Sequence, residues 1–417
     1  MPKSPSENNP SLRVLHFADA HIDMANYGRH DPNTALPVRV MDFLKSLDQI
    51  VEFAVKEPVD LVIFAGDAYK DRNPQPTFQR EWGQRIMRLS QAGIPTILLV
   101  GNHDKAPAAG RATTVQEFST LDVPHIHVAD TLAFMGPDQL GLPVQVITVP
   151  WISRSALMSR EESAGISLGD VLELIESRLT RMISNFLENA DPSLPLILAA
   201  HASVLGAKYG SERAVMLGHE LVLSEAVVRD KRLDYVALGH IHKHQSLNGG
   251  KQPPIIYSGS IERIDFGEAK EKKGFVMAEV SPGHSEWEFI SLKTRPFVDV
   301  FIEPESADDF MQYIMHHLPG EKVVAGAVCR IQLSYPRDWE PLVDEVAIAK
   351  RFKDSLSFQI LKHRHSEKRS RLGDTVSVEE LRPEELLMQY WQTIGLDEEE
   401  SKAMQILATE VLGQAVI

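Results

Sequence analysis

Five short apolar segments of this 417-residue sequence each lead directly into side chains that can bind a metal ion. The side chains that follow them are Asp19 and His21; Asp67; Asn102, His103 and Asp104; His201; and His240 and His242. Because open α/β sheets collect their chemistry at the carboxyl ends of strands, this repeated order predicts one shared site. Carboxylates, imidazoles and a carboxamide in one place can hold two metal ions.

Phosphoryl transfer is the chemistry that fits these residue types. Two divalent ions about 3.5–4 Å apart can clamp the attacking and leaving oxygens of that reaction. Asp67 is the candidate bridge between the ions because its carboxylate has two oxygens to share, and Asn102 can add a neutral amide oxygen. Mixed nitrogen and oxygen ligation favours manganese, iron or zinc over calcium or magnesium.

His103 and Asp104 are the candidate catalytic residues. His103 need not bind a metal ion, since an imidazole beside the ions can donate a proton to the leaving alkoxide or steady the phosphate charge. Asp104 follows it in the chain and can orient that ring by accepting a ring N–H.

The competing interpretation is that each motif is a local structural feature. A single histidine is more often a buried polar residue than a ligand, and Gly-Asn-His-Asp by itself is weak because Asn, Gly and Asp are common in turns. Five such motifs, each after a predicted strand, favour a metal site over five separate accidents.

Alternating strands and helices over residues 11–285 predict a layered α/β domain. Helical apolar spacing extends over residues 37–55, 77–92 and 168–187, and a sixth strand, 255–257, leads into Ser258 without a ligand. Residues 270–273 are interpreted as a charged turn, and residues 274–280 as a strand.

A second, smaller α+β domain is predicted over residues 296–362. Its strands are expected at 297–302, 328–333 and 356–361, and its helices at 307–318 and 343–352. A basic linker (363–377) and two C-terminal helices (378–417) follow. The basic stretch 362–371 can touch DNA phosphates, although a solvated linker is the favoured interpretation.

The apolar side of the C-terminal helices carries Leu386, Leu387, Tyr390 and Trp391. An exposed tryptophan on a free tail is unfavourable, so either the second domain or another protein is expected to cover Trp391, and we favour the other protein.

Composition narrows the class of protein. The net charge of -15 argues against a simple nucleic-acid binder but not against a nuclease, because bound divalent ions add positive charge that a sequence count omits. No run of about 18 apolar residues predicts a membrane span. Residues 1–10 lack the apolar core of a signal peptide and are expected to fray. A single cysteine, Cys329, fits a reducing cytoplasm.

The motif series Asp-x-His, Gly-Asp, Gly-Asn-His-Asp, His and Gly-His-x-His, over residues 19 to 242, resembles the signature of the calcineurin-like metallophosphoesterase superfamily. Within it, segments 210–216, 235–242 and 257–263 resemble the SbcD-type DNA repair exonuclease subunit, the nuclease partner of an SbcC/Rad-type ATPase. The resemblance implies a metallophosphoesterase β-sandwich flanked by helices, a capping domain and a helical tail.

The resemblance also implies residue roles. Two Mn²⁺ ions are expected, the first held by Asp19, His21, Asp67 and His242, and the second by Asp67, Asn102, His201 and His240. His103 would contact the phosphate, and the substrate-binding segment would be Tyr257, Ser258, Gly259 and Ser260.

The implied activity is 3′-to-5′ exonuclease cleavage of double-stranded DNA and endonuclease cleavage of single strands or hairpins. The implied partners are DNA, an SbcC/Rad-type coiled-coil ATPase docked on the C-terminal helices, and a second copy of the chain. The rivals are another phosphoesterase of the superfamily, acting on a phosphoprotein, cyclic nucleotide or nucleotide substrate, and a non-catalytic scaffold. Residues 22–28 and 68–71 depart from the family pattern at the expected rim of the site, which bears on the substrate rather than on metal binding.

Overall fold

The computed structural model describes residues 11–105, 111–152, 167–210 and 222–365, and in the C-terminal segment residues 387, 388, 390, 391, 400, 402–405, 407 and 408. The chain divides into two compact units. The first contains residues 1–299, 320–330 and 352–358, and the second contains residues 300–319, 331–351 and 359–417.

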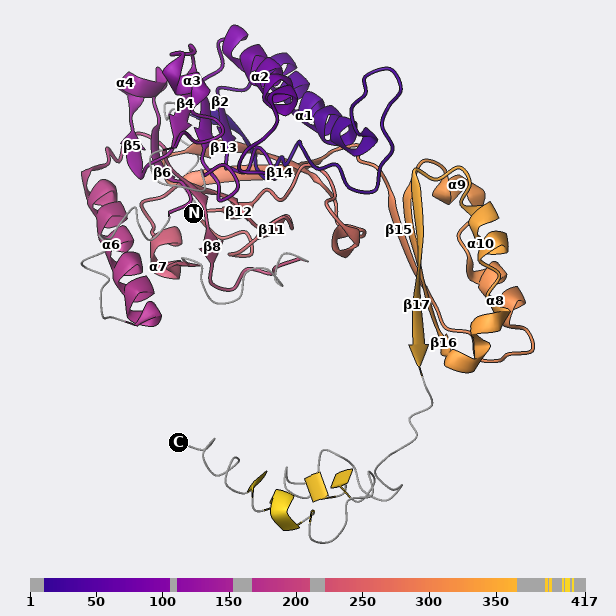
Figure 1. Cartoon of the computed structure of the whole chain (residues 1–417). Coiled ribbons are helices and arrows are strands. Elements are labelled where there is room, and N and C mark those ends of the chain that lie inside the picture. Colours follow the sequence, from indigo (N-terminus) through magenta and orange to yellow (C-terminus); the bar gives the residue numbers. More distant parts are fainter. Residues whose placement is uncertain are drawn as a thin grey trace, which may run out of the picture. The chain divides into compact units, whose positions relative to one another are not determined.

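Two six-stranded sheets form the first unit (Figure 1). One sheet has the order β14-β13-β1-β2-β3-β4, with bounds His284–Ser291, Gly274–Ser281, Leu12–Phe17, Leu61–Phe64, Thr96–Leu99 and Ile126–Ala129. The other has the order β11-β12-β10-β7-β6-β5, with bounds Gln245–Ser246, Ile255–Tyr257, Tyr235–Gly239, Leu196–His201, Gln145–Val149 and Ala133–Met135. Strands β1 to β4 are parallel, as are β12, β10, β7 and β6.

Side-chain alternation along the strands builds three apolar layers. In β1, Val14 packs with residues of the second sheet, whereas Leu15 and Phe17 pack with the helices, because successive side chains of a strand point to opposite faces. Helices α1 (Val38–Lys56) and α2 (Pro76–Gln91) cover the first sheet. Helices α6 (Leu168–Asn189) and α7 (Glu225–Val228) cover the second.

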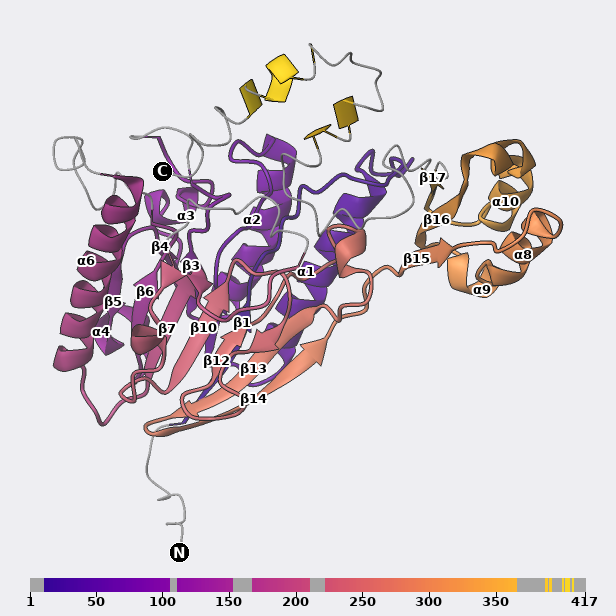
Figure 2. The same cartoon turned by 90° about the horizontal axis from the view of Figure 1, so that it is seen from below.

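Figures 1 and 2 show α6 on one side of the paired sheets and α1 and α2 on the other. The predicted layered α/β sandwich flanked by helices is therefore confirmed. Seven strands were not predicted: β4, β5, β6, β8 (Ser203–Val204), β9 (Val222–Leu223), β11 and β14. In the edge strand β14, glutamates at 286 and 288 alternate with half-buried residues, so this strand has no continuous apolar run in the sequence.

A three-stranded sheet of order β15-β16-β17, bounds Phe297–Ile302, Val328–Pro336 and Ser357–His365, carries the smaller α+β module. Its helical elements are α8 (Phe310–His317), α9 (Glu321–Val324), η3 (Arg337–Leu342) and α10 (Glu345–Arg351). The predicted order of strands and helices over residues 297–361 is confirmed, and β16 and β17 are longer than predicted.

Strand β17 corrects the interpretation of Lys362 and Arg364 as part of a solvated linker. Both lie in the strand, and Glu340 Oε1 is 3.0 Å from Lys362 Nζ and 2.8 Å from the Arg364 guanidinium. This carboxylate neutralises part of the charge that the less favoured alternative assigned to contact with DNA. Residues 366–371 of the basic stretch lie outside the described residues, as do 211–216 of the segment 210–216.

The C-terminal segment is described only in part. Trp391 is 5% exposed within this chain, so it does not need a second protein to cover it. Met388, Tyr390, Met404 and Leu407 are exposed, and Gln405 Nε2 lies 3.2 Å from Met388 Sδ. Over the described part of the chain, no helix combines the length and the apolar character needed to cross a membrane.

Candidate metal centre

The candidate ligands lie at the carboxyl edges of both sheets. Asp19, Asp67 and Asn102 follow the parallel strands β1, β2 and β3, while His201 ends β7 and His240 follows β10. The two edges approach each other so closely that a Cβ atom on Gly239 would overlap the carbonyl oxygen of Ala65. Glycine is needed at this point of backbone approach. The topology thus brings distant segments into one place.

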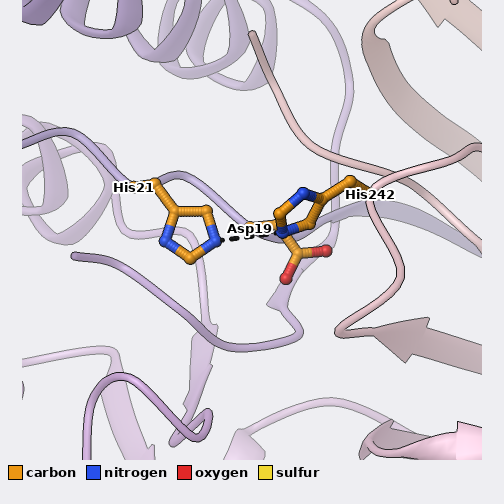
Figure 3. A group of neighbouring side chains, drawn as sticks. All are labelled: Asp19, His21 and His242. Carbon is orange, nitrogen blue, oxygen red and sulfur yellow. Dashed lines mark hydrogen bonds between the residues drawn. The ribbon is translucent and has the colours of Figure 1, made fainter. Parts of the chain in front are cut away.

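The first group of ligands consists of Asp19, His21 and His242 (Figure 3). Their ligand atoms all lie within 4.8 Å of one another. His21 Nε2 is 3.3 Å from His242 Nε2, and a dashed line marks this contact in Figure 3. The Asp19 carboxylate accepts the backbone N–H of His240, at 3.1 and 3.2 Å, which links the first group to the β10 loop.

The second group consists of Asp67, His201 and His240, with Asn102 between the two imidazoles. Asn102 Oδ1 is 3.0 Å from His201 Nε2 and 3.0 Å from His240 Nδ1. Asp67 Oδ2 is 3.3 Å from His201 Nε2 and 3.9 Å from His21 Nε2 in the first group. Asp67 therefore stands between the groups, as expected for a bridging ligand.

Hydrogen bonds to the far side of three rings prepare the histidines for metal. His21 Nδ1 donates to the Tyr69 carbonyl at 3.2 Å, and His201 Nδ1 donates to the Ala65 carbonyl at 2.7 Å. His242 Nδ1 donates to Glu268 Oε1 at 2.9 Å. Each bond selects the tautomer whose Nε2 lone pair faces the cluster, and such partners are typical of metal-binding histidines. The donor set therefore fits two divalent ions.

Backbone strain is concentrated in the same residues. Among the residues that the structure describes, eight non-glycine residues have a positive φ angle, and four of these are candidate ligands. The four are Asp19 (51°), His21 (39°), Asp67 (64°) and His240 (97°). Such conformations cost about 1–3 kcal/mol each and cluster at functional sites, where the surrounding fold enforces them.

Asp67 and His201 each change the pKa of the other. Burial alone would lower the pKa of His201, but the Asp67 charge and hydrogen bond outweigh burial and raise it to about 9. Burial opposes ionisation of Asp67, yet the His201 charge and hydrogen bond hold the pKa of Asp67 well below its usual range. Metal binding at this carboxylate therefore competes with a proton on His201.

His103 lies at the edge of the centre and is partly exposed. Its ring centroid is 5.2 Å from that of His21, and its Nδ1 donates to the Lys70 carbonyl at 2.6 Å. The buried Asp23 carboxylate accepts the backbone N–H groups of Lys70 and Asp71, which holds the loop that orients His103. The departure from the family pattern at 22–28 thus contains a residue that positions this loop.

Asp104 does not orient the His103 ring, which corrects our expectation. Its buried carboxylate accepts the backbone N–H groups of Asp67 (2.8 Å), Ala68 (2.9 Å) and Gly101 (3.0 Å) and the Thr114 hydroxyl (3.0 Å). Burial and then the Asp67 charge raise its pKa to about 6. The carboxylate is used in shaping the loops around Asp67.

The segment Tyr257–Ser260 is buried throughout. The Tyr257 hydroxyl donates to the Ala202 carbonyl at 2.7 Å, and the Ser260 N–H donates to the His242 carbonyl at 3.0 Å. Gly259, at φ +78°, leaves no room for a Cβ beside the His242 and His244 backbone. These contacts support the His242 loop, and binding of substrate by the segment stays a prediction.

Three supporting residues escaped the sequence analysis. Glu268 and Lys273, whose carboxylate and ammonium are 2.9 Å apart, form a buried pair behind His242. The stretch predicted as a charged turn, residues 270–273, therefore ends in a buried residue. Trp151 follows β6 and lies beside His240. The segment 144–149 is rich in β-branched residues and is followed by Pro150 and Trp151. This strand-like pattern was the available signal for Trp151.

The fold and the two linked ligand groups define a dimetal phosphoesterase centre. Residues 12–244, more than half of the chain, match the family described as calcineurin-like phosphoesterase. The chain belongs to this family. Among solved structures, a dimetal phosphatase from Danio rerio is similar at 12% identity and a TM-score of 0.39, over 67% of this chain and 99% of that one.

Proposed function

We propose that this metallophosphoesterase is a two-metal DNA nuclease of the SbcD type that uses manganese. The linked ligand groups that share Asp67 carry the assignment of phosphoester hydrolysis. The DNA substrate is supported by the resemblance of segments 235–242 and 257–263 and by the α+β module beyond the matched residues 12–244. Manganese suits the mixed imidazole, carboxylate and amide donors.

Bound divalent ions would supply Lewis acid stabilisation of the charge that develops on the attacking and leaving oxygens. In the proposed reaction, His103 is the residue that donates a proton to the leaving oxygen. Because Nδ1 donates to the Lys70 carbonyl, the proton for the leaving oxygen is held at Nε2 of the imidazolium form. Asp23 and the 70–71 backbone keep the ring at the edge of the centre.

The His103→Ala variant tests this role. Loss of a general acid is expected to slow cleavage by about 10²- to 10⁴-fold, with two metal ions still bound. The measurement is manganese-dependent cleavage of labelled linear duplex and hairpin DNA, with metal content determined on the same sample. The matched control is His284→Ala, since the His284 side chain is 63% exposed on the edge strand β14.

Normal cleavage by His103→Ala would remove His103 from the mechanism. The substrate is tested separately with p-nitrophenyl monoesters and diesters. Hydrolysis of a monoester with no cleavage of duplex or hairpin DNA by the wild-type protein would overturn the nuclease proposal in favour of another phosphoesterase activity.

We further propose cytoplasmic partners: a second copy of the chain, and an SbcC/Rad-type ATPase that docks on the C-terminal segment. The exposed Met388, Tyr390, Met404 and Leu407 support a docking surface there. Sedimentation of the chain with and without such an ATPase tests both. Substituting Met404 and Leu407 by Asp is expected to weaken the complex, and an unchanged complex would contradict this surface.

A further inference from the structure

Trp151 is built into the metal centre although it is not a ligand. Strand β6 runs parallel to β7, so both end at the same edge of the sheet, and Trp151 comes two residues after β6. The backbone N–H of Trp151 donates to the Val100 carbonyl at 2.8 Å, and the backbone carbonyl of Trp151 accepts from Lys105 Nζ at 3.1 Å. Residues 100 and 105 flank the segment that carries Asn102 and His103, so the Trp151 backbone is tied to the site from both ends.

The indole ring lies against the second ligand group. Its centroid is 5.0 Å from that of His240, with 43° between the planes, and 6.2 Å from that of His201, with 75° between the planes. His201 is fully buried and His240 is nearly so, whereas Trp151 keeps part of its surface exposed. Trp151 therefore places a partly exposed aromatic residue beside the ligand group at which a phosphate would bind.

We propose that Trp151 stacks against the nucleobase of the nucleotide whose phosphate binds at the centre. This inference rests on the proposed nuclease function and assigns a residue to base binding. An indole offers an aromatic face to every base without reading its sequence, which suits a nuclease of low sequence preference. Loss of such a stacking residue weakens binding by about 5- to 150-fold per base.

A purely supporting role makes a different prediction. If Trp151 only held the His240 ring, its loss would weaken every phosphate ligand equally. A base-stacking role affects only ligands that carry a base. Two ligands that share phosphate and sugar therefore separate the roles: thymidine 5′-monophosphate and its abasic analogue, 1,2-dideoxyribose 5-phosphate.

The experiment is calorimetric titration of the manganese-loaded full chain with each ligand, for wild type, Trp151→Ala and Trp151→Phe. We expect wild type to bind the nucleotide about tenfold or more tighter than the abasic analogue. Trp151→Ala should lose this preference while binding the analogue as wild type does, and Trp151→Phe should keep most of it. Trp287→Ala is the matched control, because Trp287 is also partly exposed and lies beside a histidine, the non-ligand His244, at 5.8 Å.

The proposal is overturned if wild type shows no preference for the nucleotide, if Trp151→Ala keeps the wild-type preference, or if both ligands weaken equally. The test is independent of DNA cleavage. A wild-type chain that prefers the nucleotide but cleaves no DNA would refute the nuclease function and leave base binding by Trp151 standing.

Discussion

Replacing Glu268 by Gln tests whether the buried carboxylate behind His242 prepares the first metal group. Glu268 Oε1 accepts from His242 Nδ1, and Oε2 pairs with Lys273 Nζ and accepts the Ile264 N–H, each at 2.9 Å. Burial would raise the pKa of Glu268, but the Lys273 charge and the His242 hydrogen bond outweigh burial and lower it to about 2. Gln keeps the shape of the side chain and removes its charge.

The expected loss can be scaled from these contacts. A carboxylate that orients a metal-binding histidine typically contributes 10- to 100-fold to metal affinity, or about 1.4–2.7 kcal/mol. The Glu268 carboxylate contacts the candidate ligand His242, so the loss should fall on the group of Asp19, His21 and His242. Removing one partner of a buried ion pair costs about 3–5 kcal/mol of folding stability.

Lys273 has a second carboxylate partner, Glu271, at 2.9 Å, so the stability cost should lie at or below the low end of that range. The same contact supplies the control: Glu271→Gln removes a carboxylate from Lys273 and leaves the His242 hydrogen bond intact. It should lose some stability and keep wild-type metal affinity.

The assay is equilibrium dialysis against buffered manganese, with metal content measured per chain. At a free concentration that just fills wild type with two ions, Glu268→Gln should retain about one, and Glu271→Gln should retain two. Filling of both groups by Glu268→Gln at the wild-type concentration would refute the reasoning, because the carboxylate would then have no part in metal binding.

Two further substitutions test the packing around Asp67 and the charge cluster of the smaller module. A Cβ on Gly101 would lie 2.5 Å from the Asp67 backbone N, so Gly101→Ala should lower the affinity for both ions at least tenfold. The control is Gly83→Ala, in open space on α2, which should raise the folding stability by about 0.5–1 kcal/mol. A Gly101→Ala protein that binds two ions normally would contradict the steric argument. The hydrogen bonds from Arg364 lower the pKa of Glu340 from 4.5 to about 2, so its stabilising contribution is present above pH 4.5 and is lost as the pH falls toward 2. The difference in urea midpoint between wild type and Glu340→Gln should therefore shrink over that range, and a difference independent of pH would rule out this linkage.

Local sequence patterns were sufficient to predict many of the strands and helices of the fold. Apolar runs with period-2 or helical spacing predicted β1, β2, β3 and the principal helices, because buried elements must present apolar residues at the spacing of their own geometry. Strand β14 was missed because its glutamates interrupt that pattern at an exposed edge. The burial of Lys273 was not predicted, because a charged residue in a polar run carries no local sign of a buried partner.

The candidate ligand residues themselves could be predicted from the sequence, because each stands at or shortly after the carboxyl end of a strand and the carboxyl ends of parallel strands share an edge. The family resemblance implied how they combine, and only the tertiary structure shows the contacts that bring them together. The contacts of Asn102 with His240 and of His21 with His242 join residues 138 and 221 positions apart. Likewise, Asp104 faces Asp67 rather than its neighbour His103, since hydrogen bonding follows distance and direction in space and not adjacency in the chain.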